Sequence, residues 1–231
     1  MADGVRYTRL LHPDEYRADP GCYNTWQAAF QTDDLAGAYA AVASAGGALE
    51  PVAPGDVPGE VAGGGARGVL RHTLWAPVFH THPALGEELY FSAILSRHGS
   101  WLDGHPWYDA HVPDAARRTY HCVWADGDEL SAAELAELRG LHEACTVRLP
   151  LAAGDVLVLD NLRVAHGRTP YGGDAPRRMG LMLSELVGRE ARRAPPAAWA
   201  AWRDAAMRHG HAALVAQHEK DEEDEPRAAA A

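Results

Sequence analysis

The stretch GDVLVLDNLRVAHGRTPYGGDAPRRMGLML, residues 154–183, decides the fold that the sequence predicts. Its apolar run at 156–159 predicts a strand, Asp160-Asn161 predicts a tight polar turn, and the residues up to His166 predict a second short strand. After a Gly/Pro-rich loop, a third strand is predicted to begin with the arginine pair at 177–178. Strands this short, joined by tight turns, are typical of a β-barrel. We therefore expect a histidine and an arginine on neighbouring strands.

These two residue types suit a non-haem iron site that uses 2-oxoglutarate. Fe(II) in such sites is held by two histidines and one carboxylate, which leave positions open for the co-substrate and O₂. The far carboxylate of 2-oxoglutarate needs a cation, and the planar guanidinium of arginine pairs with it through two parallel hydrogen bonds. Because side chains alternate along a strand, Arg178 shares a face with Gly180, which leaves room for a ligand. The alternative interpretation is a core histidine and a surface arginine pair.

Six segments, in order along the chain, resemble the TauD/TfdA (taurine dioxygenase-like) family, especially its clavaminate synthase-like and SyrP-like branch. The segments are GVRYTR (4–9), TWQAAFQTDD (25–34), HPALGEELYF (82–91), WADGDELSAAEL (124–135), GDVLVLDNLRVAHGR (154–168) and PRRMGLML (176–183). The resemblance implies a double-stranded β-helix (jelly roll) with flanking helices, which is an α+β, mainly β fold. It also implies an Fe(II)- and 2-oxoglutarate-dependent dioxygenase. His166 then matches the distal iron-binding histidine, and Arg178 the arginine that binds 2-oxoglutarate, with Arg177 as its substitute.

The same resemblance implies that two iron ligands lie outside this sequence. In the family, an H-x-D or H-x-E motif precedes the GVRYTR-like segment, which here begins at the fourth residue. We therefore expect the sequence to correspond to a C-terminal portion of the family domain. The other ligands would come from an N-terminal part or from a completing subunit. An incomplete barrel would also have open strand edges, which that part or subunit, or the C-terminal helix and the loops, would cover.

One internal pair offers an alternative set of ligands. His12-Pro13-Asp14 is the only H-x-D or H-x-E in the sequence, and residues two apart on a strand face the same way. Against this, Pro13 would remove a hydrogen-bond donor from the strand, and its surroundings predict a turn-rich loop. We interpret His12 and Asp14 as a chance match and keep them only as the alternative iron ligands.

Other histidines form a second possible metal set. His80 and His82 would share one face of a strand, and Asp103, His105 and His111 follow soon after. Their spacing is unconventional for a metal site, and the resemblance gives His82 an architectural role. We predict no second metal here.

Length and local patterns predict one domain with an extension. The 231 residues, 47% of them apolar, allow a single sizeable core. We expect the jelly-roll portion in residues 1–188, a helical extension in 189–218 that covers a sheet edge or joins a partner, and an acidic, Ala-rich disordered tail in 219–231. Helices are predicted at 33–45 and 131–145, the second opened by an S-x-x-E capping box. Strands are predicted at 69–75 and 88–95.

Net charge and cysteine content narrow the possible binding partners and the cellular compartment. A net charge of −11 argues against nucleic acid as a partner. Three cysteines without metal or redox spacing predict reduced thiols in a cytoplasmic protein. The sequence has no apolar run long enough to span a membrane, so no membrane association is expected.

Three functional hypotheses follow. The first is a 2-oxoglutarate-dependent hydroxylase or related oxidase whose remaining iron ligands come from outside this sequence or from another copy of the chain. The second is a self-sufficient enzyme that uses His12, Asp14 and His166. The third is a non-catalytic remnant or assembly module that has lost the iron site. Met182 stands where some relatives place a second, substrate-facing arginine, which favours a small or carrier-bound amino-acid-like substrate of natural-product biosynthesis over a sulfonate.

Overall fold

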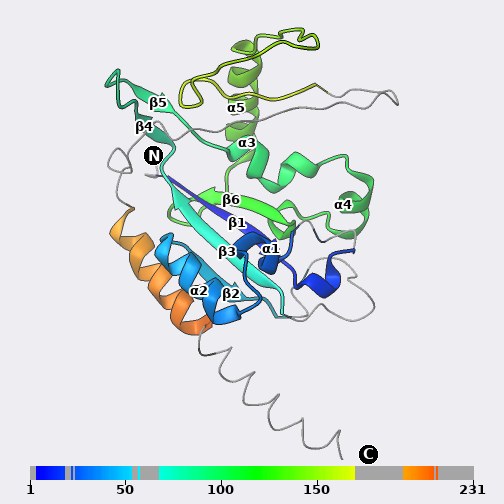
Figure 1. Ribbon diagram of the computed structural model, residues 1–231, viewed down its shortest axis with the longest axis vertical. Coiled ribbons are helices and arrows are strands. Elements are labelled where there is room, and N and C mark those ends of the chain that lie inside the picture. The colour runs from blue at the N-terminus through cyan, green and yellow to red at the C-terminus, as the bar shows by residue number, and fades with distance from the viewer. Residues whose placement is uncertain are drawn as a thin grey trace, which may run out of the picture.

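A four-stranded antiparallel sheet forms the centre of the molecule (Figure 1). The structure is a computed structural model of the full sequence, and it describes residues 4–18, 22, 24–53, 57, 68–169, 195–210 and 212. The strand order is β2-β3-β1-β6, and every pairing is antiparallel. The strands are β1 (Val5–Leu11), β2 (Ala48–Pro51), β3 (Leu70–Ala76) and β6 (Tyr120–Trp124). A separate hairpin pairs β4 (Phe79–Thr81) with β5 (Glu88–Tyr90).

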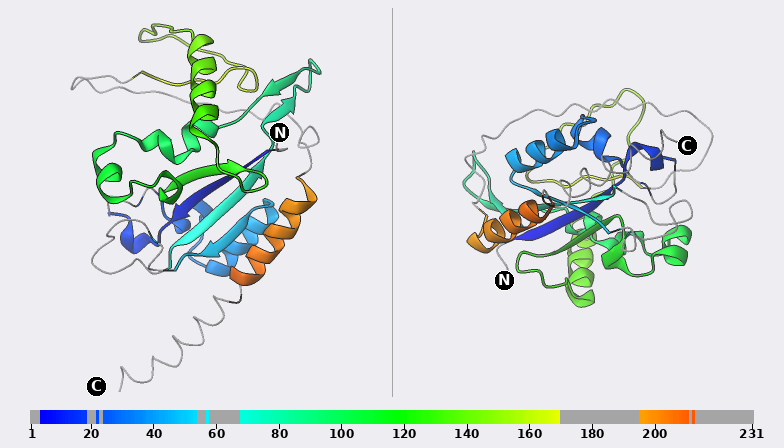
Figure 2. Two further views of the ribbon diagram at one scale, coloured as in Figure 1. Left: turned by 180° about the vertical axis from the view of Figure 1, so that it is seen from behind. Right: turned by 90° about the horizontal axis from the view of Figure 1, so that it is seen from below.

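Helices cover both faces of the sheet (Figure 2). On one face lie α1 (Trp26–Phe30) and α2 (Leu35–Ser44), which bury a core that includes Tyr39 and Leu49. On the other face lie α3 (Ile94–Arg97) and α5 (Ala132–Ala144), with Ile94 and Leu135 in a second core. Short helical turns fill the connections: η1 (Asp14–Tyr16), η3 (Gly99–Leu102), α4 (Pro106–His111) and η4 (Ala115–Arg117).

Capping residues fix the starts of the two longer labelled helices. The Asp34 carboxylate accepts from two backbone amides at the start of α2. At α5, Ser131 and Glu134 form the reciprocal capping box, which satisfies backbone donors that the helix itself leaves open. Both predicted helices are confirmed. The leucine stripe of α5 is only partly buried, because Leu135 is in the core whereas Leu141 is 56% exposed.

A further helix over residues 197–210 lies beside β2 (Figure 1). The Met207 Sδ is 3.2 Å from the backbone nitrogen of Leu49 in β2. Trp199 is only 1% exposed, and the Arg6 guanidinium lies 5.1 Å from the ring centroid of Trp202. The helix therefore covers the β2 edge of the sheet.

Three strand predictions were wrong within the described residues. The short strand expected to end at His166 is absent, because residues 164–169 have no regular secondary structure. The strand predicted at 88–95 ends at Tyr90, because the Ser92 hydroxyl bonds the Tyr7 hydroxyl and accepts from the Ile94 amide, where α3 begins. The run 156–159 forms no strand, and Val156 is 86% exposed. A strand needs a neighbour for its backbone N–H and C=O groups, and no described strand lies beside this run.

The described architecture agrees with the α+β part of the expected fold. Antiparallel sheets with helices are present, while the double-stranded β-helix stays a prediction. The third strand, predicted from residues 177–178 onward, lies outside the described residues. No helix that the structure describes is long and apolar enough to cross a membrane.

Candidate functional site

The polar turn at Asp160 is held against the β4–β5 hairpin by His82. The His82 Nε2 lies 3.0 Å from Asp160 Oδ2. The other ring nitrogen, Nδ1, accepts from the amides of Ala84 and Leu85, so Nε2 carries the proton and donates it to the carboxylate. This hydrogen bond from His82 is the main cause that lowers the pKa of Asp160 below its usual value. His82 thus positions the turn, in line with the architectural role expected for it.

The turn itself forms as the sequence predicts. The backbone amides of Arg163 and Val164 both donate to the Asp160 carbonyl at 3.0 Å, and the Asp160 carboxylate accepts from the Leu162 amide. Asp-initiated turns of this kind close on their own side chain. The turn therefore determines where the chain leaves toward His166.

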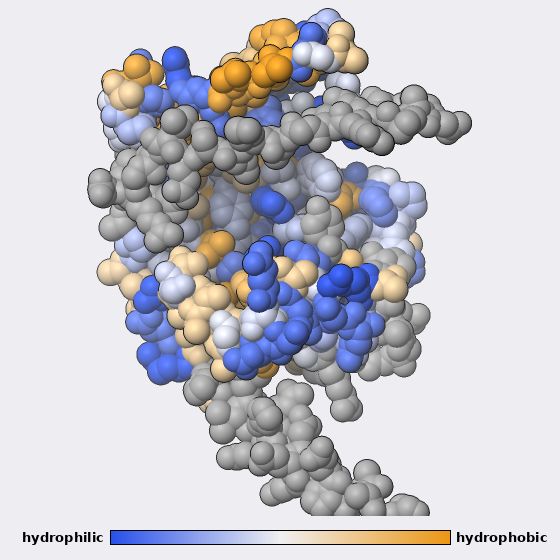
Figure 3. Space-filling model, viewed as in Figure 1, coloured by the Kyte–Doolittle hydropathy of each residue, from blue (hydrophilic) through white to orange (hydrophobic). Residues whose placement is uncertain are grey.

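His166 is exposed and lies beyond this turn, in a segment without regular secondary structure. Arg177 and Arg178 lie outside the described residues. Several apolar side chains around the turn also face solvent, and Figure 3 shows apolar surface over the segment that follows α5. The exposed large apolar residues of this segment are Val147, Leu149, Leu151, Val156, Leu157, Val158 and Val164. Exposed apolar patches of this kind are typical of surfaces that contact another molecule or segment.

His12 and Asp14 point to different surroundings. His12 is buried, and its backbone forms a parallel bridge with Thr25. Asp14 is exposed and pairs with Arg17 at 2.9 Å. Hydrogen bonds from Thr25 and then Arg17 lower the pKa of Asp14. Within the described part of the chain, His12, Asp14 and His166 do not come together as a group of three metal ligands. The alternative iron ligands stay a prediction that the described geometry does not favour.

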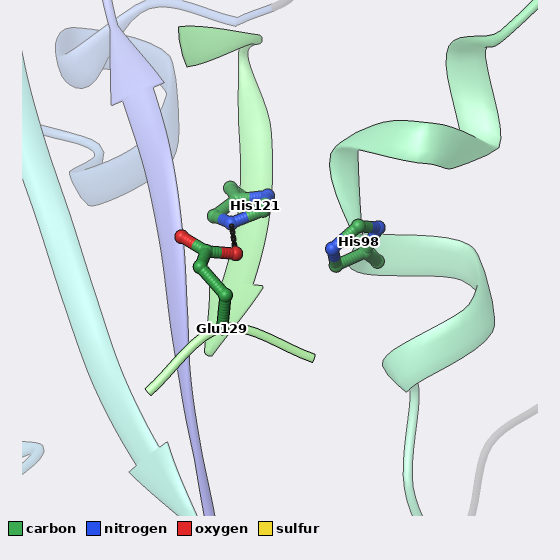
Figure 4. A group of neighbouring side chains, drawn as sticks. All are labelled: His98, His121 and Glu129. Carbon is green, nitrogen blue, oxygen red and sulfur yellow. Dashed lines mark hydrogen bonds and ion pairs between the residues drawn. The ribbon is translucent and has the colours of Figure 1, made fainter. Parts of the chain in front are cut away.

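One group of three ligand-type side chains does come together, and the sequence interpretation missed it. His98, His121 and Glu129 have ligand atoms that all lie within 4.8 Å of one another (Figure 4). Both histidines are 6% exposed, and their ring centroids are 4.6 Å apart. Burial and the nearby His121 lower the pKa of His98. The residues stand 23 and 8 positions apart along the chain, so no short sequence motif identifies the group.

Hydrogen bonds within the protein already use several of the possible ligand atoms in this group. The His121 Nδ1 accepts from the Gly99 amide at 3.3 Å, and its Nε2 lies 2.9 Å from Glu129 Oε2. An Nδ1 that accepts leaves the proton on Nε2, which therefore donates to the carboxylate. His98 Nδ1 similarly contacts Ser100 at the start of η3. Two imidazoles and a carboxylate are the residue types of a non-haem iron site. Here, however, their hydrogen bonds connect β6 to η3.

The second possible metal set, His80 and His82 with Asp103, His105 and His111, does not come together in the structure. Asp103 pairs instead with Arg118, at 2.7 Å. The His111 Nδ1 lies 2.8 Å from the Trp107 carbonyl. Among the residues that the structure describes, His98, His121 and Glu129 are the only such group of three.

Comparison with known proteins places the chain in a family. It is 32% identical over 62 residues to the dapdiamide synthesis protein DdaC of Enterobacter agglomerans, covering 27% of this chain and 19% of that protein. It is 28% identical over 177 residues to a clavaminate synthase-like protein of Arabidopsis thaliana, covering 76% of this chain and 46% of that protein. The chain thus spans about half the length, or less, of these relatives. Since the profile described as taurine catabolism dioxygenase TauD, TfdA family matches residues 68–183, half of the chain, the chain belongs to that family.

Proposed function

We propose that this chain is the C-terminal, 2-oxoglutarate-binding part of an Fe(II)-dependent dioxygenase that hydroxylates a small or carrier-bound amino-acid-like substrate. The observation that carries the proposal is the family match over residues 68–183, which includes His166, Arg177 and Arg178. The His82–Asp160 contact supports it, because it joins two of the segments on which the resemblance rests. Relatives named for dapdiamide synthesis and as clavaminate synthase-like support an amino-acid-like substrate.

The residue types suit the iron and its co-substrate, but the described residues alone do not make the family's iron site. His166 belongs to no group of three metal ligands in the described part of the chain. We propose that His166 gives one imidazole and that a carboxylate and a second histidine come from residues outside the described ones. Arg178 would then bind the far carboxylate of 2-oxoglutarate through its two parallel N–H groups.

The proposed overall reaction is balanced by O₂ and 2-oxoglutarate. 2-Oxoglutarate loses CO₂ and takes up one oxygen atom to become succinate. The other oxygen atom enters a C–H bond of the substrate, which becomes a hydroxyl group. Succinate formed per substrate hydroxylated is therefore the readout specific to this function.

An anaerobic titration with Fe(II) and 2-oxoglutarate tests the proposal. The iron–2-oxoglutarate chelate has a weak visible charge-transfer band. We expect no band from this chain alone, and a band when the N-terminal half of a relative that carries an H-x-D or H-x-E motif is added. His166→Ala should abolish the band. Arg178→Met should weaken 2-oxoglutarate binding about tenfold to a hundredfold, as expected for lost charge-assisted hydrogen bonds.

Three matched variants separate the alternatives. Arg177→Met removes the same charge one residue away, and an effect equal to that of Arg178→Met would move the co-substrate contact to the other arginine. A band from this chain alone that disappears in His12→Ala would support the self-sufficient enzyme. Glu129→Gln tests the buried His98 group as the iron position, and we expect it to leave the band unchanged. A band that survives His166→Ala would contradict the proposal.

A further inference from the structure

Two histidine side chains accept hydrogen bonds from consecutive backbone amides at the start of η3. His98 Nδ1 accepts from the Ser100 amide at 3.2 Å and is the N-cap of this helix. His121 Nδ1, from β6, accepts from the Gly99 amide at 3.3 Å. The first amides of a helix have no partner within it, so the two imidazoles satisfy donors that the helix leaves open. Both hydrogen bonds require an unprotonated Nδ1.

These hydrogen bonds fix where each ring carries its proton. An Nδ1 that accepts has no proton, so each neutral imidazole carries its proton on Nε2. In His121, this Nε2–H donates to Glu129 Oε2 at 2.9 Å. A metal ion needs the lone pair of a ring nitrogen, and on both rings that lone pair is already used by an amide. The geometry of His98, His121 and Glu129 therefore suits a group that responds to protons rather than a metal site.

The backbone at the start of η3 has little freedom to adjust. A Cβ at Gly99 would overlap the carbonyl oxygen of Ala115, so the chain packs tightly against η4. The Gly99 carbonyl accepts from Arg118 at 2.9 Å, and Arg118 is itself buried. An amide held in this way cannot turn toward a new acceptor. A change at either Nδ1 therefore acts directly on the contact between η3 and β6.

Charged groups from several elements face His98. Figure 4 shows its ring facing His121 and Glu129, and the two ring centroids are 4.6 Å apart. Burial is the main cause that lowers the pKa of His98, and His121 is the next. Arg139 of α5 acts in the same direction, whereas Glu129 and Asp103 act in the opposite one. Positive charge on both rings at once is thus unfavourable while η3 stays packed against β6.

We propose that His98, His121 and Glu129 form a pH-sensitive latch, which holds η3 against β6 at neutral pH and releases it in mild acid. A proton on His98 Nδ1 puts a second donor where the Ser100 amide needs an acceptor, so the cap of η3 is lost. The same change at His121 sets its own N–H against that of Gly99. With both amides left without acceptors, η3 separates from β6.

Nuclear magnetic resonance of the full chain tests the latch without iron or 2-oxoglutarate. Near neutral pH, nitrogen-15 spectra of both imidazoles should show an unprotonated Nδ1 and a protonated Nε2. Hydrogen exchange is then followed at the Gly99 and Ser100 amides from about pH 7.5 to about pH 5, the range in which histidine titrates. After correction for the intrinsic effect of pH, protection of each amide should fall about tenfold, as expected for one lost hydrogen bond.

His98→Asn separates the cap from the titration. An asparagine side chain accepts from a helix amide but does not titrate, so the loss of protection at Ser100 should shrink to about twofold. The matched control is His105→Asn, because His105 is exposed and stands at the N-cap of α4 without a side-chain hydrogen bond to that helix. This control should keep the full loss of protection at Ser100.

Four results would overturn the inference. The first is a protonated Nδ1 on either ring near neutral pH, which is measured on the unmodified chain and needs no folded variant. The second is protection at Gly99 and Ser100 that does not change with pH. The third is an equal loss at Ser100 in His98→Asn and His105→Asn. The fourth is saturable Zn²⁺ binding that Glu129→Gln abolishes, because zinc would need the lone pairs that the latch assigns to the amides.

Discussion

His82 and Asp160 are joined by a 3.0 Å contact between Nε2 and Oδ2, although 78 residues separate them in the sequence. Asp160→Asn and His82→Phe should each loosen the turn that follows, because the imidazole N–H no longer meets a carboxylate. We expect faster hydrogen exchange at the amides of Leu162, Arg163 and Val164. Arg163→Gln is the control, since its own ion pair with Glu87 is long (4.0 Å) and exposed.

The same contact predicts a pH dependence of the turn. The pKa of Asp160 is lowered in the folded chain, chiefly by the His82 hydrogen bond. The stabilisation is therefore fully present above the carboxyl's unfolded pKa and is lost as pH falls through the lower, folded value. A carboxyl NMR titration of Asp160 should give a value below the usual range that returns toward it in His82→Phe. An unchanged titration would show that the contact does not form in solution.

Arg118 should be the most costly arginine to remove. It is 3% exposed and donates to the carbonyls of Gly99 and Val112 at 2.9 and 3.0 Å. Its two aspartate partners are 65% and 48% exposed, so most of the cost comes from the buried carbonyls. We expect Arg118→Met to lower the free energy of unfolding by about 3 kcal/mol in a urea titration. Arg117→Met, at the exposed neighbour, should change it by less than about 0.5 kcal/mol.

His72 should make stability depend on pH below neutrality. Burial, helped by the charge of Arg9, lowers the pKa of His72 to about 4. Between about pH 6.5 and 4 the unfolded chain binds a proton at this residue and the folded chain does not, so stability falls as pH falls. The loss should be on the order of 3 kcal/mol. The free energy of unfolding, measured at several pH values, should lose this pH dependence in His72→Gln. In His105→Gln, a change at an exposed histidine, the dependence should remain.

Trp199 should anchor the C-terminal helix. Its side chain is 1% exposed and stacks on Trp202 with ring centroids 5.1 Å apart. Trp199→Ala leaves a cavity and is expected to cost about 3 to 5 kcal/mol. Trp101→Ala provides a control of the same residue type, because Trp101 is 61% exposed and should cost less than about 0.5 kcal/mol. Equal losses in the two variants would contradict the docking of residues 197–210.

Elements with local signals were predictable from the sequence. The Ser131–Glu134 capping box indicated the start of α5, because it acts within one turn of the helix. The Ala-rich run of 33–45 indicated α2. Strand β3 followed from its β-branched and aromatic residues. The turn at Asp160 followed from a side chain that bonds its own backbone.

Features that depend on distant partners were not predictable in the same way. The run 156–159 has the composition of a strand, but composition does not supply the neighbouring strand that it needs. The group of His98, His121 and Glu129 forms only because η3 packs against β6. The family resemblance was confirmed, whereas the roles of His166, Arg177 and Arg178 stay predictions.

The position of β1 sets the order in which this chain can fold. It is the first strand that the structure describes yet an inner strand of the sheet, with Val5 paired to Ala76 on one side and to Trp124 on the other. The ribosome therefore releases β1 long before either neighbour exists, and the β1–β6 ladder must wait for more than a hundred further residues. Closing such long loops costs entropy before the contacts compensate for it, which slows folding. Until β3 is made, the backbone N–H and C=O groups of β1 lack their partners on both sides, which leaves the strand open to pairing with another chain.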